Sequence, residues 1–378
     1  MNVSRIWGKY FGPALLAAVL ALFFFSGPTA AQSLKDLPPP PPPPPTPTPT
    51  PVPTPKDEDF EVIRTTSNLV MVPVSVVNPQ GEPVVGLQVA DFRLQEEGKE
   101  QQITELGNPE QVPLDIAILF DISSSVSQKG FFAFQQKAAA TFLKQVLKPV
   151  DRAAIFTIAG EPQLVQPLAS AEVAAAKFLM IPPATSSVPT AFYDTVSAAA
   201  KYLLENAGER HRRVILVISD GDDNFSNLVK DLSIAEARAS LKGEVTPAEA
   251  KRNLDARRQR AVSEVQRAVQ QADVAFYSIN PGGASVRLNQ ISTRAQNAMH
   301  SIAESTGGSA FVPDGERELE RVFSEVAAEL RGQYLVMYYS NNQASGGQFR
   351  TIKVAVPTHQ EFRIRARQGY YPKVAKTK

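Results

Sequence analysis

Hydrophobic and polar residues follow two different periods along this chain, and the period changes twice. In the middle of the chain, short apolar runs such as Leu114–Phe120 and Val214–Ile218 alternate with segments of helical periodicity. Strands that alternate with helices in this way predict a mostly parallel sheet with helices on both faces. We therefore expect a doubly wound α/β domain over residues 111–332.

The segments on either side of this domain have the period of two that is typical of antiparallel strands. Residues 60–110 contain a β-branched run, a Pro-Gln-Gly turn and a hairpin pattern in DFRLQEEGKEQQITEL. Pro73 lies within the first run and predicts an edge position or a bulge. Residues 333–373 contain three further strand-like runs. Since neither flank is large enough for a core of its own, we expect both to pair into one small β-sandwich around the inserted α/β domain.

A long, charged helical stretch interrupts the central domain at residues 228–271. The segment KGEVTP within it predicts a break, with Thr246 as the cap and Pro247 as the first residue of a second, longer helix. The charges indicate a helical face in contact with solvent. The alternative is an arm that binds a partner.

Residues 1–59 show no pattern of a folded core. Residues 1–31 contain two basic residues, an apolar stretch and then small residues, which predicts a secretory signal cleaved after Ala31. The apolar stretch is shorter than the roughly 20 residues of a spanning helix, and an uncleaved anchor is the alternative. Residues 32–59 are rich in proline and predict an extended, disordered linker. We therefore expect an exported protein of the periplasm, cell envelope or extracellular space, with residues 374–378 as a short tail.

The composition of the chain argues against several kinds of binding or catalytic site. The formal net charge is +1, which argues against a nucleic-acid binder built on bulk positive charge. The chain has no cysteine, which excludes disulfides, zinc–thiolate sites and a thiol nucleophile. The three histidines, His211, His300 and His359, are far apart and lack ligand spacing. We therefore do not expect a histidine-based metal site or catalytic triad, although residues far apart in sequence can be neighbours in a fold.

Three polar loops lie at strand ends or at the start of a helix. The sequence DISSS follows the first buried run and contains Asp121, Ser123 and Ser125. The second loop, SSVPTAFYDTV, offers Thr190, and the third, VISDGDDN, offers Asp220. Because ligands of doubly wound sheets bind at the carboxyl ends of the strands, we expect these side chains to converge.

Two carboxylates and three hydroxyls suit a hard divalent cation. Magnesium prefers oxygen ligands, keeps several waters and is usually bound through one or two carboxylates; Mn²⁺ or Ca²⁺ is the alternative. If the hydroxyls bind directly and the carboxylates act through water, a carboxylate from a partner could complete the shell. Asp222 and Asp223 could support such an ion, but we expect them to be exposed loop acids. For Asp194 we expect a solvent-facing or locally capping role.

This pattern resembles the metal-ion-dependent adhesion site of von Willebrand factor type A (VWA) domains. The motif of that site is Asp-x-Ser-x-Ser, then a threonine in a second loop, then an aspartate that often lies within SDG. The resemblance implies a Rossmann-like VWA fold with an intact metal site formed by Asp121, Ser123, Ser125, Thr190 and Asp220. In that family the two serines and the threonine contact the metal, the aspartates often act through water, and the ligand contributes an acidic group.

The flanking sequences carry a second resemblance. VPVSVVNPQGEPVVGLQVADFRLQEEGKEQQI before the domain and RGQYLVMYYS after it are similar to the bacterial VWFA-related family named for Acidobacteria. Members of that family are exported. The resemblance supports the sandwich-and-insert architecture and does not specify the ligand.

Three functions compete. The first is an exported, non-enzymatic module that binds an acidic side chain of a protein partner through Mg²⁺, with membrane contact only through the N-terminal signal or anchor. The second is a metal-dependent hydrolase that uses the same ion; no general base in an unusual setting and no phosphate-cradling glycine loop is evident for it. The third is a structural or assembly role in the cell envelope with the metal site unused.

Overall fold

All described residues belong to one unit of the chain, Arg64–Lys378. The computed structural model describes residues 69–123, 132–184, 186, 188–230, 238–239, 241–283, 290–342 and 347–372. Several predictions fall outside these residues: the signal peptide (1–31), the linker (32–59), the tail (374–378) and the candidate ligand Ser125.

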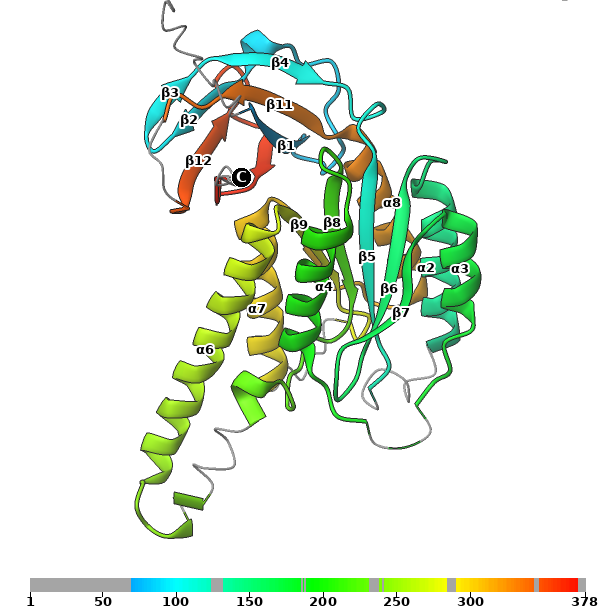
Figure 1. The fold of residues 1–378 in the computed structure, drawn as a ribbon, viewed down its shortest axis with the longest axis vertical. Coiled ribbons are helices and arrows are strands. Elements are labelled where there is room, and N and C mark those ends of the chain that lie inside the picture. Colours follow the sequence, from blue (N-terminus) through cyan, green and yellow to red (C-terminus); the bar gives the residue numbers. More distant parts are fainter. Residues whose placement is uncertain are drawn as a thin grey trace, which may run out of the picture. The chain divides into compact units, whose positions relative to one another are not determined.

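A six-stranded sheet forms the centre of the inserted domain (Figure 1). Its strand order is β10-β9-β8-β5-β6-β7, with bounds β5 Leu114–Asp121, β6 Arg152–Ile158, β7 Gln163–Ala169, β8 Arg212–Ile218, β9 Val274–Ile279 and β10 Ala310–Phe311. Neighbouring strands are parallel, except that β7 runs antiparallel to β6. The predicted doubly wound, mostly parallel sheet is confirmed.

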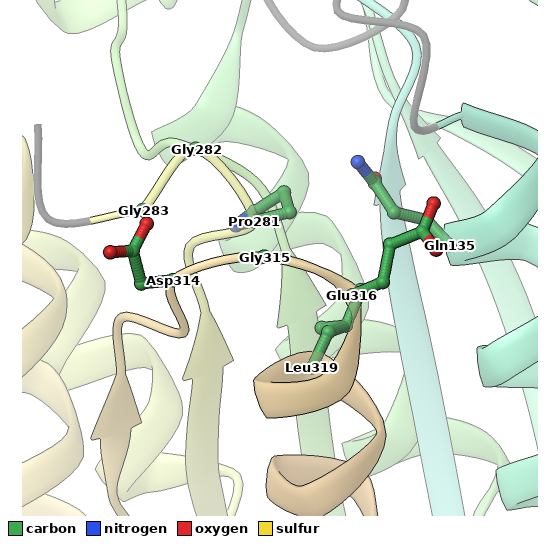
Figure 2. Close-up of a pocket in the computed structure, with 8 residues that line it drawn as sticks. All are labelled: Gln135, Pro281, Gly282, Gly283, Asp314, Gly315, Glu316 and Leu319. Atoms are coloured by element: carbon green, nitrogen blue, oxygen red, sulfur yellow. The ribbon is translucent and has the colours of Figure 1, made fainter.

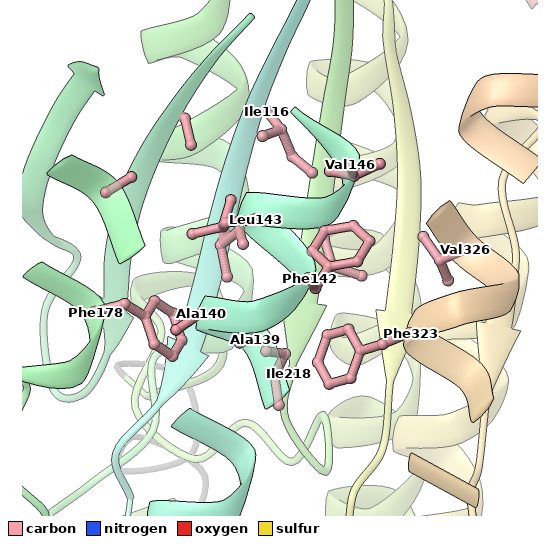
Figure 3. Close-up of a cluster of buried hydrophobic side chains, with 14 of the residues drawn as sticks. Ile116, Ala139, Ala140, Phe142, Leu143, Val146, Phe178, Ile218, Phe323 and Val326 are labelled. Atoms are coloured by element: carbon pink, nitrogen blue, oxygen red, sulfur yellow. The ribbon is translucent and has the colours of Figure 1, made fainter. Parts of the chain in front are cut away.

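Helices cover both faces of this sheet because its strands are apolar on both sides. One face packs against α2 (Phe132–Val146), α3 (Ala171–Leu179) and α8 (Glu316–Gly332). The other face packs against α4 (Phe192–Asn206), α6 (Pro247–Gln271) and α7 (Gln290–Thr306). Strand β5 is buried along its whole length. Figure 3 shows the first of these cores, in which the rings of Phe142 and Phe323 lie 5.4 Å apart between α2 and α8.

The flanking strands form two four-stranded antiparallel sheets with a shared core. The sheet orders are β13-β1-β11-β4 and β14-β12-β2-β3. The bounds are β1 Leu69–Val77, β2 Arg93–Glu96, β3 Lys99–Gln101, β4 Ile103–Gly107, β11 Tyr334–Tyr339, β12 Arg350–Ala355, β13 Arg363–Ala366 and β14 Gly369–Tyr370, with a short 3-10 helix at Val89–Asp91. The N-terminal β1 pairs with the C-terminal β11, and β2 pairs with β12. The two flanks therefore combine, as the sequence predicted.

The predicted edge position of the strand that contains Pro73 is wrong. Strand β1 lies between β13 and β11. Pairing with β13 begins only at Val74, opposite Ala366, whereas Pro73 is opposite Leu335 of β11. Pro73 therefore has a strand neighbour on one side only, which explains how an interior strand accommodates a residue without an N–H group.

The long second helix of the predicted insertion is confirmed as α6. Thr246 caps it: its hydroxyl accepts a hydrogen bond from the N–H of Glu249, and its own N–H donates to the Glu249 carboxylate. Ala261, Val265 and Val269 bury the C-terminal part of α6, and Figure 1 shows the N-terminal part extending past α7. Among the described helices, none is both long and apolar enough to cross a bilayer.

Candidate metal site

Asp121 is the last residue of β5 and is 0% exposed. One carboxylate oxygen accepts a hydrogen bond from the backbone N–H of Ser123 (2.8 Å), which turns the chain over the end of the strand. The other oxygen accepts a hydrogen bond from the hydroxyl of Ser219 (2.5 Å), which follows β8. The carboxylate therefore ties two adjacent strand ends together. Ser123 is 1% exposed beside it.

The ionised form of Asp121 is less favourable in the folded protein than it is for a carboxylate in water. Burial and the negative charge of Asp220 raise the pKa of Asp121 from 3.8 to about 6, although hydrogen bonds from Ser123 and Ser219 act in the opposite direction. A cation near the two carboxylates would favour their ionised forms and so offset both causes. The donor set therefore fits a divalent ion.

Thr190 precedes α4 and is 4% exposed. Its N–H donates to the side-chain oxygen of Asn224 (3.0 Å), and its carbonyl accepts hydrogen bonds from the N–H groups of Asn224 and Phe225. The next residue, Ala191, donates its N–H to the carbonyl of Ala159 beyond the end of β6 (2.7 Å). The second polar loop is thus fixed to the third loop and to the sheet edge.

Asp220 begins the third loop and is partly exposed. Ser219 before it donates its N–H to the carbonyl of Ile279 at the end of β9 (3.1 Å), and its hydroxyl oxygen accepts the N–H of Gly221 (2.9 Å). Gly221 has φ +73°, and a Cβ there would lie 2.7 Å from the side chain of Met299. The SDG sequence is therefore a turn that requires glycine in order to present Asp220.

Asp223 is buried, so the prediction that it is an exposed loop acid is wrong. It is 5% exposed, and it accepts hydrogen bonds from the N–H of Tyr193 in the first turn of α4 (2.8 Å) and from the hydroxyl of Ser226 (2.5 Å). Burial raises its pKa while these hydrogen bonds lower it. Asp223 therefore joins the second and third loops. Its spacing from Ser226, whose N–H it also accepts, indicates a local turn in the sequence but not the contact with α4.

Two other acids near these loops, Asp222 and Asp194, have different surroundings from Asp223. Asp222 is partly exposed, and burial together with the charge of Asp220 raises its pKa. Asp194 accepts a hydrogen bond from the N–H of Asn227 (2.9 Å), 33 residues further along the chain, where a helical segment begins. The carboxylate therefore caps a distant segment, and the expected local cap is not observed.

The structure brings the loops of Asp121, Ser123, Thr190 and Asp220 to one sheet edge through these hydrogen bonds. Ser125 lies outside the described residues. In the part of the chain that the structure describes, no group of three or more His, Cys, Asp or Glu side chains could hold a metal. The assignment of the individual ligands stays a prediction.

The fold and this polar edge define the class of the protein. The chain belongs to the von Willebrand factor type A domain family, whose model matches residues 115–325, more than half of the 378 residues. Domains of this family commonly mediate protein–protein interactions and often bind a divalent metal.

Several solved structures with low sequence identity match part of this chain. Proximal thread matrix protein 1 from the mussel byssus is 15% identical, with a TM-score of 0.39. The match covers 61% of this chain and 49% of the mussel protein. This chain thus spans about half of the mussel protein. A von Willebrand factor type A protein from Catenulispora acidiphila is 13% identical, with a TM-score of 0.41. The match covers 71% of this chain and 51% of that protein. An aerotolerance-related membrane protein from Bacteroides fragilis is 17% identical, with a TM-score of 0.35. The match covers 57% of this chain and 98% of that protein. The search of curated proteins found no match.

Proposed function

We propose that this is an exported protein that binds a protein partner through a divalent ion. The ion is Mg²⁺, with Mn²⁺ or Ca²⁺ as alternatives, and its site is formed by Asp121, Ser123, Ser125, Thr190 and Asp220, which bind it directly or through water. An acidic side chain of the partner completes the shell. The observation that carries the proposal is the fully buried carboxylate of Asp121, on which the charge of Asp220 acts at the carboxyl edge of a parallel sheet.

The hydrogen bonds of Asp121 support this assignment of roles. Both of its oxygens already accept hydrogen bonds, from Ser123 and Ser219, so the carboxylate is suited to act on the ion through water. The hydroxyls then contact the ion directly and leave it with most of its positive charge. Such an ion supplies a strong attraction for an added carboxylate.

We propose binding rather than hydrolysis as the activity. A hydrolase would need a free general base near the ion. Asp223, the most buried acid of the third loop besides the proposed ligands, already accepts hydrogen bonds from Tyr193, Phe225 and Ser226. That arrangement supports a structural role for Asp223.

Export and family subgroup are part of the same proposal. The signal-like residues 1–31 and the proline-rich residues 32–59 support a protein whose binding domain is held off the cell envelope or a related surface. The flanking sequences support membership of the bacterial VWFA-related group named for Acidobacteria.

The metal site can be tested with Mn²⁺ as the probe. Water-proton relaxation measures Mn²⁺ that is bound with exchangeable water, and we expect enhancement with the wild-type chain. Adding acetate should reduce the enhancement as a carboxylate replaces water. Asp121→Asn should abolish it, whereas Glu105→Gln, an exposed acid of β4, should leave it unchanged. Equal enhancement in the wild type and Asp121→Asn would refute the assigned site.

The partner can be sought by capture from an envelope extract. We expect capture in Mg²⁺, and loss of capture both in EDTA and with Asp121→Ala. Capture that is equal under all three conditions would contradict metal-dependent binding. Ester hydrolysis that disappears both in EDTA and in Asp121→Ala would instead favour the hydrolase.

A further inference from the structure

A pocket separate from the candidate metal ligands opens at the same edge of the sheet. It lies where the chain leaves β9 and enters α8, beside α2 (Figure 2). It is lined by Gln135, Pro281, Gly282, Gly283, Asp314, Gly315, Glu316 and Leu319. None of these residues is a proposed metal ligand.

Backbone hydrogen bonds connect this pocket to the metal edge. Ser219 donates its N–H to Ile279, the last residue of β9, and Asn280 donates its N–H to Phe311 at the end of β10 (2.8 Å). The side chain of Asn280 then accepts the N–H of Gly282 in the pocket wall (2.9 Å). A partner that covers the third polar loop would therefore lie beside the pocket.

Gln135 gives the pocket an unsatisfied acceptor. Its side chain reaches from α2 toward the loop of Pro281 and Gly282 (Figure 2). The residue is 2% exposed, and its Oε1 has no hydrogen-bond partner among the described residues. The neighbouring Gln136 is also buried but donates its amide to the carbonyls of Phe178 and Ile181. A buried acceptor without a donor is unfavourable, and a ligand that donates an N–H group would satisfy it.

The remaining pocket residues define the charge of that ligand. Asp314 and Glu316 are exposed, and neither carboxylate is in an ion pair with a described residue. Glu318 differs, because it accepts the N–H of Asp314 and lies 3.9 Å from Arg321. An anion would meet two negative charges here, even though α8 begins at this point. The pocket is therefore suited to a cation.

We propose that this pocket binds a basic side chain, lysine or arginine, of a protein partner. The amide of Gln135 turns its buried Oε1 toward the ligand and accepts an N–H group of that side chain, while the charge of the side chain faces Asp314 and Glu316. Its aliphatic stem packs on Pro281 and Leu319, because both residues contribute apolar surface to the lining. The inference needs no metal. If the metal site also binds as proposed, the partner presents an acidic and a basic side chain to the same edge.

The test is a titration of the full chain with acetyl-arginine-amide, followed in amide NMR spectra in EDTA and again in Mg²⁺. We expect saturable shifts of the Gln135 side-chain amide and of the N–H groups of Gly282 and Gly283 in both conditions. Acetyl-citrulline-amide has nearly the same shape without the charge, and inorganic phosphate tests the opposite charge. Neither should produce saturable shifts at these groups.

Two variants and one control separate this site from a general effect of charge. Glu316→Gln removes a rim carboxylate, and Gln135→Leu removes the acceptor while preserving side-chain size. Each should weaken arginine binding by about fivefold or more. Glu320→Gln, an exposed acid on the same helix outside the pocket, should bind as the wild type does.

Several results would overturn the inference. These are the absence of saturable shifts with acetyl-arginine-amide, equal binding of the citrulline compound, phosphate binding at the same groups, or wild-type affinity of Glu316→Gln. Because the titration in EDTA requires no ion, failure here leaves the metal proposal standing. Loss of Mn²⁺ binding in the relaxation experiment likewise leaves this one standing.

Discussion

The guanidinium of Arg365 in β13 lies 2.5 Å from the carboxylate of Glu329 in α8. Glu329 is 4% exposed and also accepts hydrogen bonds from the hydroxyls of Ser75 in β1 (2.8 Å) and Tyr277 in β9 (2.9 Å). Burial and the charge of Glu329 raise the pKa of Tyr277 well above its ordinary value, so the phenol stays a donor. A charged residue of the last helix thus joins the sandwich to the inserted domain.

Replacing Glu329 with glutamine should strongly destabilise the protein. The change leaves Arg365, which is one-quarter exposed at its side chain, without its anion, and we expect a loss of about 3 kcal/mol in the free energy of unfolding. Urea denaturation measures it. Glu325→Gln is the control, because Glu325 lies on the same helix in an exposed pair with Arg321 and should cost ~0.5 kcal/mol or less. Equal losses for the two variants would show that the buried network is not stabilising.

Asp121→Asn should stabilise the protein in EDTA at pH 7.5. The substitution removes a buried charge that faces Asp220, and we expect the free energy of unfolding to rise by ~1–3 kcal/mol. The same variant should lose the stabilisation that Mg²⁺ gives the wild type. Thermal denaturation with and without Mg²⁺ measures both effects. A variant that is less stable than the wild type in EDTA, yet still stabilised by Mg²⁺, would contradict this account.

Metal affinity should fall at acidic pH. The pKa of Asp121 is raised to about 6 in the folded, ion-free protein, so that state holds a proton more tightly than the unfolded chain does. The stability that protonated Asp121 contributes is therefore present below its unfolded pKa and is lost as the pH rises through about 6. An ion must displace this proton, so the affinity for Mn²⁺ should drop by about tenfold per pH unit below 6. Titration calorimetry at pH 7.5 and 5.0 checks this; equal affinities would exclude proton competition at Asp121.

Gly221→Ala should destabilise the protein more than Gly243→Ala. Both glycines have positive φ, +73° and +71°, so the backbone strain is matched. A Cβ at Gly221 would also lie 2.7 Å from the buried side chain of Met299, whereas a Cβ at Gly243 would meet nothing within 4 Å. We expect about 1 kcal/mol of strain in each case and a further ~1 kcal/mol at Gly221. Gly221→Ala should also weaken Mn²⁺ binding, and equal effects of the two variants would argue against a required turn at Asp220.

Local patterns were sufficient to predict most of the fold. The buried run Leu114–Phe120 became β5, and the cap at Thr246 became the start of α6. The predicted hairpin forms around Glu97 and Gly98, whose positive φ values of 50° and 73° suit a two-residue turn between β2 and β3. In each case, the residues that determine the structure are neighbours in sequence.

Features that depend on distant segments were not predictable from the sequence. Asp223 reads as an exposed loop acid in SDGDDN, but the N–H of Tyr193 in α4, far from it in sequence, brings it into the interior. Gln135 and Gln136 are adjacent in one helix, and only the packing of α3 and α8 decides that one is satisfied and the other is not. The place of Pro73 in an interior strand depends on where the C-terminal β13 ends, at Ala366 opposite Val74.

The antiparallel register of β1 and β11 has a mechanical consequence. Leu69, where the described chain enters the sandwich, is opposite Tyr339, and Val74 is opposite Tyr334, which follows α8. Tension between the chain before Leu69 and a partner on the inserted domain would pull β1 and β11 in opposite directions along their length. The hydrogen bonds between the two strands would then be loaded together, in shear. They would not break one after another from one end.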